Sequence, residues 1–504
     1  MKNVVSGIQC FIIIFHLILC FPLHAQVQNN AIRQYNQFRQ QARQEYDDFR
    51  RQCNEEYAEF LKQAWQSYAS GPVIPVPEEK PVPPVVMPDE DKDKTVEPQP
   101  IIIDETVSPV IEEPEPQPKP VAPIHEHTEP TTQYFSFTFF GTEGRVRVPK
   151  TKSTALMALS GGFDNKSLSA VWQELSGSDY DNLVRDCLEL RIRHNLCDWA
   201  YLMMLQKLGD AYCGEKTNAS TMLTAWLYCQ SGYEMRLASA GDHLYLLFGS
   251  KHLIYGLPNF SFEDTYFYPL LHQDEELAEY VDVCDVPYPN EEPLSLFLLQ
   301  DQQFAEYMSN ERTIRSSRFT NAVATYSVNQ NLMEFYSTYP TSLFGENICS
   351  RWAMYANTPM ETHLRSQLYP QLKSVIAGRS QLEAAEILLN WVQTGFVYEY
   401  DDKVWGGDRA FFAEESLYYP YCDCEDRSIL FTRLVRDLLG LRCILIYYPG
   451  HLASAVQFTD AVNGDYIMLN GKRFIVTDPT YIGAPVGRTM PDMDNQTAKV
   501  ILLE

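Results

Sequence analysis

The chain has 504 residues, of which 45% are hydrophobic, and it carries a formal net charge of −26. This length exceeds that of one ordinary domain and the apolar content suffices for globular cores, so we expect two or three folded units. The strong negative charge argues against nucleic acid, or an anionic membrane surface, as the main partner.

Residues 1–25 predict a signal peptide. The stretch "MKNVVSGIQCFIIIFHLILCFPLHAQ" has Lys2 next to its start and Ala25, a small residue suited to cleavage, next to its end. Between them lies an apolar run of about a dozen residues, as in a signal core. The run is too short for a comfortable membrane span, so we expect an exported chain without a transmembrane span in its mature form. Lipid anchoring at Cys20 is a minor alternative.

Residues 28–69 predict one amphipathic helix made of three 11-residue units. The units 32–42, 43–53 and 54–64 align Tyr35, Tyr46 and Tyr57, then Phe38, Phe49 and Phe60, then Ala42, Cys53 and Ala64. This repeat corresponds to about 3.67 residues per turn and keeps the aromatic stripe on one face. The stripe fits self-association or partner docking through residues 32–64, and it fits equally well a helix folded back onto the globular part.

Residues 70–132 are rich in proline and acidic side chains, as in "EEKPVPPVVMPDEDKDK". Such a stretch buries too little apolar surface to offset its chain entropy, so it predicts an extended linker.

Two globular units follow, at 133–295 and 296–504, and both contain a buried helix followed by two strands. The first has "TNASTMLTAWLYCQSG", "EMRLAS" and "HLYLLFG", and the second has "CEDRSILFTRLVRDLLG", "RCILIYY" and "HLASAVQF". An offset of 208 residues aligns Ser220 with Ser428, Thr224 with Thr432, Gly232 with Gly440 and His243 with His451. We therefore expect an α+β protein with an internal duplication. Lys216 then stands at the position of Cys424, so the first copy would lack that thiol, although Cys213 lies close by.

Three residues of the second unit fit an activated thiol. Cys424 begins the buried helix, where unpaired backbone N–H groups and the helix dipole favour a thiolate and can bind an oxyanion. His451 opens a strand after a Pro-Gly turn, and Asp478 ends a later strand before Pro479. A histidine can act as base for the thiol, and a carboxylate can fix the tautomer of the ring. Each residue alone is more often structural, and their order along the chain favours catalysis.

Residues 380–485 resemble the core of the transglutaminase-like superfamily of papain-like thiol enzymes. The motifs "CEDRSILF", "HLASAV" and "DPTY" fit, in order, its cysteine helix, its histidine strand and its aspartate strand end. The resemblance implies a helix with cysteine at its N-terminus packed on an antiparallel sheet. It makes Cys424 the nucleophile, His451 the general base and Asp478 the orienting carboxylate. Together with export, it implies a bacterial periplasmic or cell-surface protein, and the first unit matches only in degenerate form.

Further candidates lie close to Cys424 in the sequence. Asp426 is expected either to support the active-site loop or simply to be a favourable acid in the first helical turn. Trp405, Tyr418 and Tyr419 fall in the aromatic segment 398–421 and are candidates for the second oxyanion donor or the cleft. Cys422 is expected to be unbridged, because a Cys-x-Cys loop is strained. We expect no cofactor and no metal, because no phosphate loop, dinucleotide fingerprint or zinc spacing occurs.

These features favour an exported cysteine-dependent acyl-transfer enzyme that acts on protein or peptide amide bonds. The thioester formed by the thiol can pass to water, which gives hydrolysis, or to an amine, which gives crosslinking. We favour hydrolysis, since the sequence has no feature specific to crosslinking. The alternative is a non-catalytic binding or envelope scaffold protein built on the same fold.

Overall fold

The computed structural model describes residues 37–38, 40–41, 44–77, 81–91, 97–108, 131–345 and 347–504. The predicted signal peptide, its cleavage after Ala25, lipid anchoring at Cys20 and the first repeat residue Tyr35 lie outside these ranges. Among the described residues, no helix combines the length and the apolarity needed to cross a membrane.

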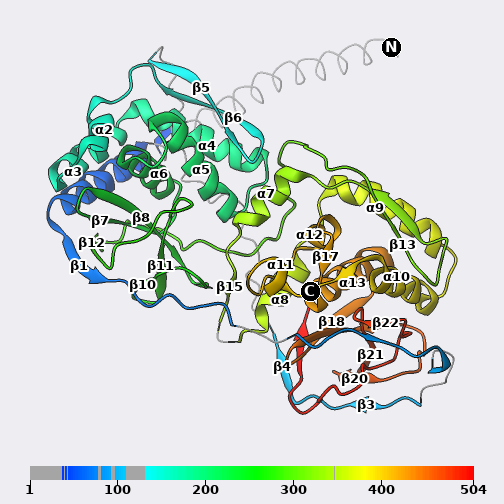
Figure 1. Ribbon diagram of the computed structural model, residues 1–504. Helices are drawn as coiled ribbons and strands as arrows, with labels where there is room; N and C mark the ends of the chain where they lie inside the picture. The colour runs from blue at the N-terminus through cyan, green and yellow to red at the C-terminus, as the bar shows by residue number, and fades with distance from the viewer. Residues whose placement is uncertain are drawn as a thin grey trace, which may run out of the picture.

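The chain is of the α+β class and forms two lobes, each with helices packed on a mainly antiparallel sheet (Figure 1). Besides the N-terminal helix, described over 44–63, the first lobe has the helices α2 (Thr154–Ala158), α3 (Asn165–Leu175), α4 (Asp181–Arg193), α5 (Asp198–Cys213) and α6 (Asn218–Gln230), with the short 3₁₀ helices η2 (Leu159–Gly161) and η3 (Ser178–Tyr180). Its strands are β1 (Trp65–Ala69), β5 (Thr132–Phe139), β6 (Thr142–Pro149), β7 (Met235–Ala240), β8 (His243–Ser250), β9 (Leu253–Ile254), β10 (Phe260–Phe262), β11 (Thr265–Pro269) and β12 (Tyr280–Cys284).

The second lobe has the helices α7 (Gln330–Thr338), α8 (Ser350–Asn357), α9 (Thr362–Ile376), α10 (Gln381–Gly395), α11 (Asp401–Val404), α12 (Ala413–Tyr418) and α13 (Cys424–Leu439). Its strands are β13 (Arg312–Arg315), β14 (Val323–Tyr326), β15 (Ser342–Leu343), β16 (Val397–Tyr398), β17 (Tyr421–Cys422), β18 (Arg442–Tyr448), β19 (His451–Gln457), β20 (Tyr466–Leu469), β21 (Lys472–Thr477), β22 (Tyr481–Ile482) and β23 (Lys499–Leu502). Earlier in the chain, β2 (Val85–Val86), η1 (Asp89–Asp91), β3 (Pro100–Ile101) and β4 (Glu105–Val107) also belong to this lobe. One continuous cluster of buried apolar side chains runs through both lobes, from Tyr57 to Ile501.

The sheets of the two lobes share the order of five adjacent strands, but their edges differ, because β1 is antiparallel to β12 whereas β4 is parallel to β23 and β3 has no counterpart. The first sheet runs β1-β12-β7-β8-β11-β10, and the second runs β4-β23-β18-β19-β21-β20-β3. The central hairpins also have the same register, because Ala240 pairs with His243 and Tyr448 pairs with His451. Both pairs are related by the offset of 208 residues, so the repeated helix and hairpin expected from the sequence occupy equivalent places.

The segment expected to be an extended linker contributes strands to the second lobe. β2 pairs in parallel with β22, whereas β3 and β4 extend the two edges of the main sheet next to β20 and β23. Ile101 and Val107 are buried there, and Pro100 is compatible with an edge strand because it needs no ladder donor. The prediction of an extended linker is therefore wrong for the described part of this segment. Its residues Ile101 and Val107 are buried where β3 and β4 pair with the edges of the sheet.

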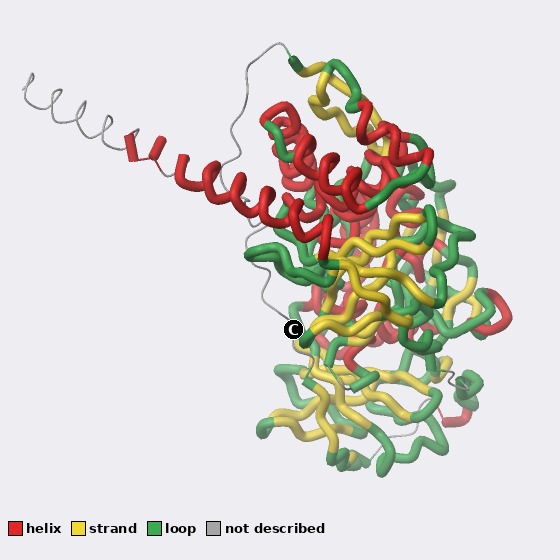
Figure 2. The backbone as a smooth tube through the Cα atoms, turned by 90° about the vertical axis from the view of Figure 1, so that its left-hand side faces the viewer, coloured by secondary structure: helices red, strands yellow, loops and turns green. Residues whose placement is uncertain are grey.

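The N-terminal helix ends at residue 63, before the predicted end at residue 69. Residues 65–69 form β1 instead, because their backbone pairs with β12 over the whole length of the strand. The helix lies against the first lobe and its amino-terminal turns project beyond it (Figure 2). Tertiary pairing overrides the helical repeat at this end.

Tyr57, one of the aromatic residues of the repeat, packs the N-terminal helix against the first lobe. Tyr57 is 1% exposed, and its ring lies 4.6 Å from that of Trp172. The indole N–H of Trp172 donates to Asn54 Oδ1 at 2.9 Å, and Arg50 Nε donates to Gln230 Oε1 at 2.8 Å. The helix is thus folded back on the globular part. The repeat residues Phe38, Phe49 and Phe60 remain exposed, and self-association through them stays a prediction.

We predict that Tyr57→Ala destabilises the protein by about 3 kcal/mol, because it opens a cavity between the helix and the first lobe. Phe60→Ala is the matched control on the same helix, at a position that is 42% exposed, and we expect less than about 0.5 kcal/mol from it. Urea unfolding followed by tryptophan fluorescence measures both. Equal losses from the two variants would contradict the docking described here.

Candidate active site

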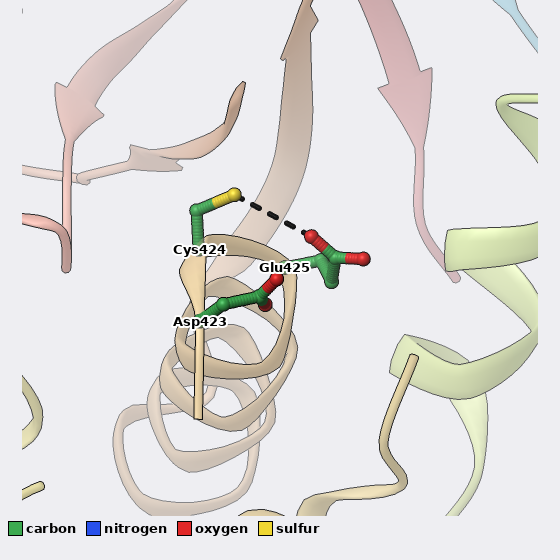
Figure 3. A group of neighbouring side chains, drawn as sticks. All are labelled: Asp423, Cys424 and Glu425. Carbon is green, nitrogen blue, oxygen red and sulfur yellow. Dashed lines mark hydrogen bonds between the residues drawn. The ribbon is translucent and has the colours of Figure 1, made fainter. Parts of the chain in front are cut away.

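Cys424 is the first residue of α13, a helix that packs against β19, and it lies between Asp423 and Glu425 in the first turn (Figure 3). Asp423 is the N-cap, and a capping box joins it to Asp426. The other end stops at Gly440, whose φ of 66° is left-handed, so the predicted end of the helix is confirmed. The sequence therefore places the thiol at a capped helix N-terminus.

Asp426 ties the aromatic segment to this helix. Its Oδ1 accepts the backbone N–H of Phe411 at 2.9 Å, and its Oδ2 accepts that of Asp423 at 3.2 Å. The Ser416 hydroxyl donates to its backbone carbonyl at 3.4 Å. Asp426 thus combines both roles considered for it, since it completes the cap and supports the loop before the cysteine.

The surroundings of the thiol are dry and acidic. Cys424 is 2% exposed, and its Sγ donates to Glu425 Oε2 at 3.4 Å (Figure 3). Burial raises the pKa of Cys424 well above its ordinary value, and the charges of Asp423 and Glu425 raise it further. Burial and the neighbouring acids therefore outweigh the lowering of the Cys424 pKa that we expected from the helix N-terminus.

His451 and Asp478 form a buried pair. His451, the first residue of β19, is 1% exposed, and its Nε2 lies 2.9 Å from Asp478 Oδ2. The other ring nitrogen, Nδ1, is buried and makes no hydrogen bond. A carboxylate accepts hydrogen bonds only, so this pairing puts the ring proton on Nε2 and leaves a lone pair on Nδ1.

Leu452 and Ser428 connect the helix that carries the cysteine to the strand that carries the histidine. The backbone of Leu452, the residue after His451, is the one neighbour that acts to lower the pKa of Cys424, against the larger raising effects of burial, Asp423 and Glu425. The Ser428 hydroxyl, one turn further along α13, donates to the Leu452 carbonyl at 2.7 Å. Ser428 is one of the residues shared by the two halves in the alignment. The helix that begins with Cys424 therefore contacts the strand that begins with His451, and His451 is paired with Asp478.

Gln393 on α10 is a positioning residue that the sequence analysis missed. Its Nε2 donates to the backbone carbonyls of Asp478, Tyr481 and Ala484 at 2.8–3.1 Å, and its Oε1 accepts the N–H of Gly483. One buried amide therefore holds the whole loop after β21. The sequence shows only that Gln393 lies on the buried face of a predicted helix. That position alone does not distinguish it from any other buried glutamine.

Asp478 is held by the same loop. Its Oδ1 accepts the backbone N–H groups of Thr480 at 2.8 Å and Tyr481 at 3.2 Å. Both donors follow Pro479 in the "DPTY" motif, so the turn fixes the carboxylate that faces His451.

The three aromatic candidates lie in a cluster of their own around Arg409. Trp405 packs edge-on against Tyr419 at 4.7 Å, and Tyr418 packs against Tyr419 at 5.0 Å. The Arg409 guanidinium lies 4.7 Å from the centre of the Trp405 ring. These residues shape the segment before the cysteine, and a role for them as oxyanion donor or cleft stays a prediction.

Tyr398, on β16, pairs with Cys422 on β17, two residues before the thiol. Burial raises its pKa, and the charge of Cys424 is the next cause, ahead of Asp423 and Glu425. Arg427 of α13 lies 5.3 Å from the centre of the Tyr398 ring and donates to the Phe396 carbonyl at 2.9 Å. Tyr398 is the first residue of the segment "YEYDDKVW". Pairing of β16 with β17 brings it near the cysteine, and this pairing could not be predicted from the sequence.

Buried acids gather behind the thiol. Asp401, Asp408 and Glu425 have carboxylate oxygens within 4.8 Å of one another, as have the ligand atoms of Asp423, Cys424 and Glu425. Burial raises the pKa of Glu425 to about 8 and that of Asp401 to about 7. These are the residues that could hold a cation. Arg351 already pairs with Asp408 at 2.6 Å, and a site without metal stays our prediction.

The equivalent place in the first lobe has different chemistry. Lys216 and His243, which align with Cys424 and His451, are both exposed. Instead, His272 lies 2.9 Å from Asp210 and 3.1 Å from Glu275, and the hydrogen bond to Asp210 contributes most to raising its pKa to about 9. An ion-pair network therefore stands at this place, and Cys213 at the end of α5 is a buried thiol near it, whose pKa burial raises to about 12.

We compared the chain with protein-family models, with curated proteins and with solved structures, and none of them matches.

We predict that Glu425→Gln lowers the pKa of Cys424. The glutamine retains an oxygen that accepts the thiol hydrogen bond but removes a negative charge, which favours the thiolate. Each unit by which the pKa falls increases the thiolate fraction about tenfold at a pH below it. The pH profile of iodoacetamide alkylation, with the modified residue located by mass spectrometry, gives this pKa.

Asp402→Asn is the control, since Asp402 is an exposed acid in the same segment and its removal should leave the profile unchanged. A profile that is the same for Glu425→Gln and the wild type would show that Glu425 does not act on the thiol.

Proposed function

We propose that the second lobe is a cysteine-dependent acyl-transfer enzyme with a papain-like, transglutaminase-like core, and that it hydrolyses protein or peptide amides. The observation that carries this proposal is the buried His451 ring. Its Nε2 is held by Asp478, its Nδ1 has no hydrogen bond, and the carbonyl of the next residue, Leu452, accepts a hydrogen bond from Ser428 on the helix that begins with Cys424. A histidine with one nitrogen held by a carboxylate and the other free beside a thiol is equipped to act as a base.

In the proposed reaction, His451 Nδ1 takes the proton from Cys424 Sγ as the sulfur attacks the carbonyl carbon of the amide. The C–N bond then breaks, and the leaving amine takes that proton from Nδ1. Water, deprotonated by the same nitrogen, attacks the thioester, and the carboxylic acid leaves as the thiol is restored. Asp478 stays ionised and stabilises the imidazolium formed in both halves of the reaction.

Charge on the tetrahedral intermediate would be stabilised from two sides. The backbone N–H of Cys424 lies at the N-terminus of α13, where amide groups point outward along the helix axis. The Tyr398 hydroxyl is our candidate for the second donor, in addition to Trp405, Tyr418 and Tyr419, because strand pairing places Tyr398 opposite Cys422, two residues before the thiol.

Export to the periplasm or cell surface and a bacterial source are part of this proposal, and so is duplication of the core. The shared order of five adjacent strands and the shared hairpin register of the lobes support duplication. The first lobe would then be a non-catalytic copy, because Lys216 replaces the cysteine.

A non-catalytic binding or scaffold protein is the second candidate function. The observation in its favour is the buried acidic setting, which raises the pKa of Cys424 and so keeps the thiol protonated at neutral pH. Under this alternative, His451 and Asp478 are structural, and the thiol reacts only in the unfolded chain.

We predict that Cys424→Ala abolishes hydrolysis of p-nitrophenyl acetate and of fluorogenic peptide amides, with a loss of at least about 10³-fold, because no other group can form the acyl-enzyme. Cys422→Ala, which removes a buried thiol two residues away, and Lys216→Ala in the first lobe are the matched controls and should retain most activity. Circular dichroism checks that each variant is folded. Equal losses from Cys424→Ala and Lys216→Ala would contradict the assignment of catalysis to the second lobe.

A further inference from the structure

We propose that residues 81–87, named the strap here, occupy the place of a peptide substrate at the thiol site and must leave before a substrate can bind. This inference rests on the proposed function. It adds regulation by the chain itself, and it specifies the substrate as an extended peptide that pairs through its backbone.

The strap contacts the histidine side of the site through Val82. The backbone N–H of Val82 donates to the Gly450 carbonyl at 2.8 Å. Gly450 directly precedes His451, and its φ of 77° belongs to the turn that aims the histidine strand. The strap is therefore attached to the residue next to the proposed base.

The same residue also engages the tyrosine beside the thiol. The Tyr398 hydroxyl donates to the Val82 carbonyl over a long 3.5 Å. Tyr398 is our candidate oxyanion donor, so this contact takes up the hydroxyl that a reacting carbonyl would need. A substrate carbonyl and the strap would compete for one donor.

The rest of the strap pairs with the loop after Asp478. β2 adds in parallel to β22, with Val85 opposite Tyr481, and the Met87 N–H donates to the Ile482 carbonyl at 2.9 Å. The Met87 side chain is buried in a small cluster with Tyr481, Ala484 and Met490. Since Tyr481 also donates its N–H to Asp478, the strap reaches the residues next to the carboxylate as well as those next to the histidine.

This mode of attachment is how proteins bind extended peptides. Backbone hydrogen bonds to a strand edge supply affinity, and a pocket for one side chain supplies selectivity. Prolines at 81, 83 and 84 keep the strap extended and lower the entropy lost on docking. The anchor is one buried methionine beside the exposed Val86, which gives an attachment that a peptide can displace. The peptide expected at this place is therefore extended, with an apolar side chain at the position of Met87.

The test compares two neighbouring positions of the strap in the full chain. Met87→Asp places a charge in the buried cluster and should detach the strap, whereas Val86→Asp changes a side chain that is 68% exposed. The readout is the rate of iodoacetamide alkylation at Cys424 at a fixed pH, located by mass spectrometry. We expect at least about a tenfold increase for Met87→Asp, because an exposed thiol reacts faster than a covered one, and less than about a twofold change for Val86→Asp.

Replacement of residues 81–87 by a glycine–serine segment of equal length is the second variant, in case Met87→Asp disturbs the fold. It removes every side chain of the strap and keeps the chain connected, and it should also increase the rate at least about tenfold. Hydrogen exchange at the Val82 and Met87 amides reports detachment of the strap in Met87→Asp. An alkylation rate that stays at the wild-type value in the glycine–serine variant would overturn the proposal.

This readout separates the strap from the proposed chemistry, because alkylation reports access to the thiol and needs no substrate. Faster alkylation without any peptide hydrolysis would support the proposal that the strap covers the thiol, and it would contradict the proposed hydrolytic activity. Hydrolysis at full rate while the strap stays protected from exchange would support the enzyme and overturn the strap. A synthetic peptide with the sequence of residues 81–88, added to the glycine–serine variant, should slow alkylation again, and a scrambled peptide should not.

Discussion

The first turn of α13 is the constraint on which the second lobe depends, because it buries a cysteine and three acids together. Burying a charged carboxylate away from water costs free energy. Burial therefore raises the pKa values of Asp423, Glu425 and Asp426, which disfavours their charged forms. The capping box also joins Asp423 and Asp426 by hydrogen bonds. Asp426 draws the aromatic segment onto the helix, while Ser428 fastens the helix to β19. The thiol therefore meets the histidine strand in one fixed geometry, set by polar contacts that tolerate little displacement.

The two lobes have corresponding central strands but different side chains at the positions of Cys424 and His451. Five adjacent strands of their sheets correspond in order, and their central hairpins have the same register. Function then depends on single positions. In the first lobe, Lys216 and His243 face solvent, and a His272 ion-pair network fills the neighbouring space. Shared folds fix where a site can be, and local side chains decide whether it exists.

Much of the site could be predicted from the sequence, because its signals are local. The helix from Cys424 to Gly440, the strand that begins at His451 and the Asp478-Pro479 strand end all rest on caps, turns and alternation close along the chain. What could not be predicted depends on partners far along the chain. The end of the N-terminal helix before Trp65, the strands β2 to β4 and the approach of Tyr398 to Cys424 all arise from pairing between distant segments. Burial likewise reversed the expected lowering of the Cys424 pKa, since the sequence does not show that the helix N-terminus is closed off from water.

The most direct test of the account is capture of the acyl-enzyme. The glycine–serine variant of residues 81–87 is incubated with a peptide ester, quenched in acid and analysed by mass spectrometry of its fragments. The account predicts an acyl group on Cys424 that neutral hydroxylamine removes, and its loss when His451 is changed to glutamine. Failure of any acyl group to form on Cys424, or its formation at the same rate without His451, would contradict the claim that these residues form a catalytic thiol site.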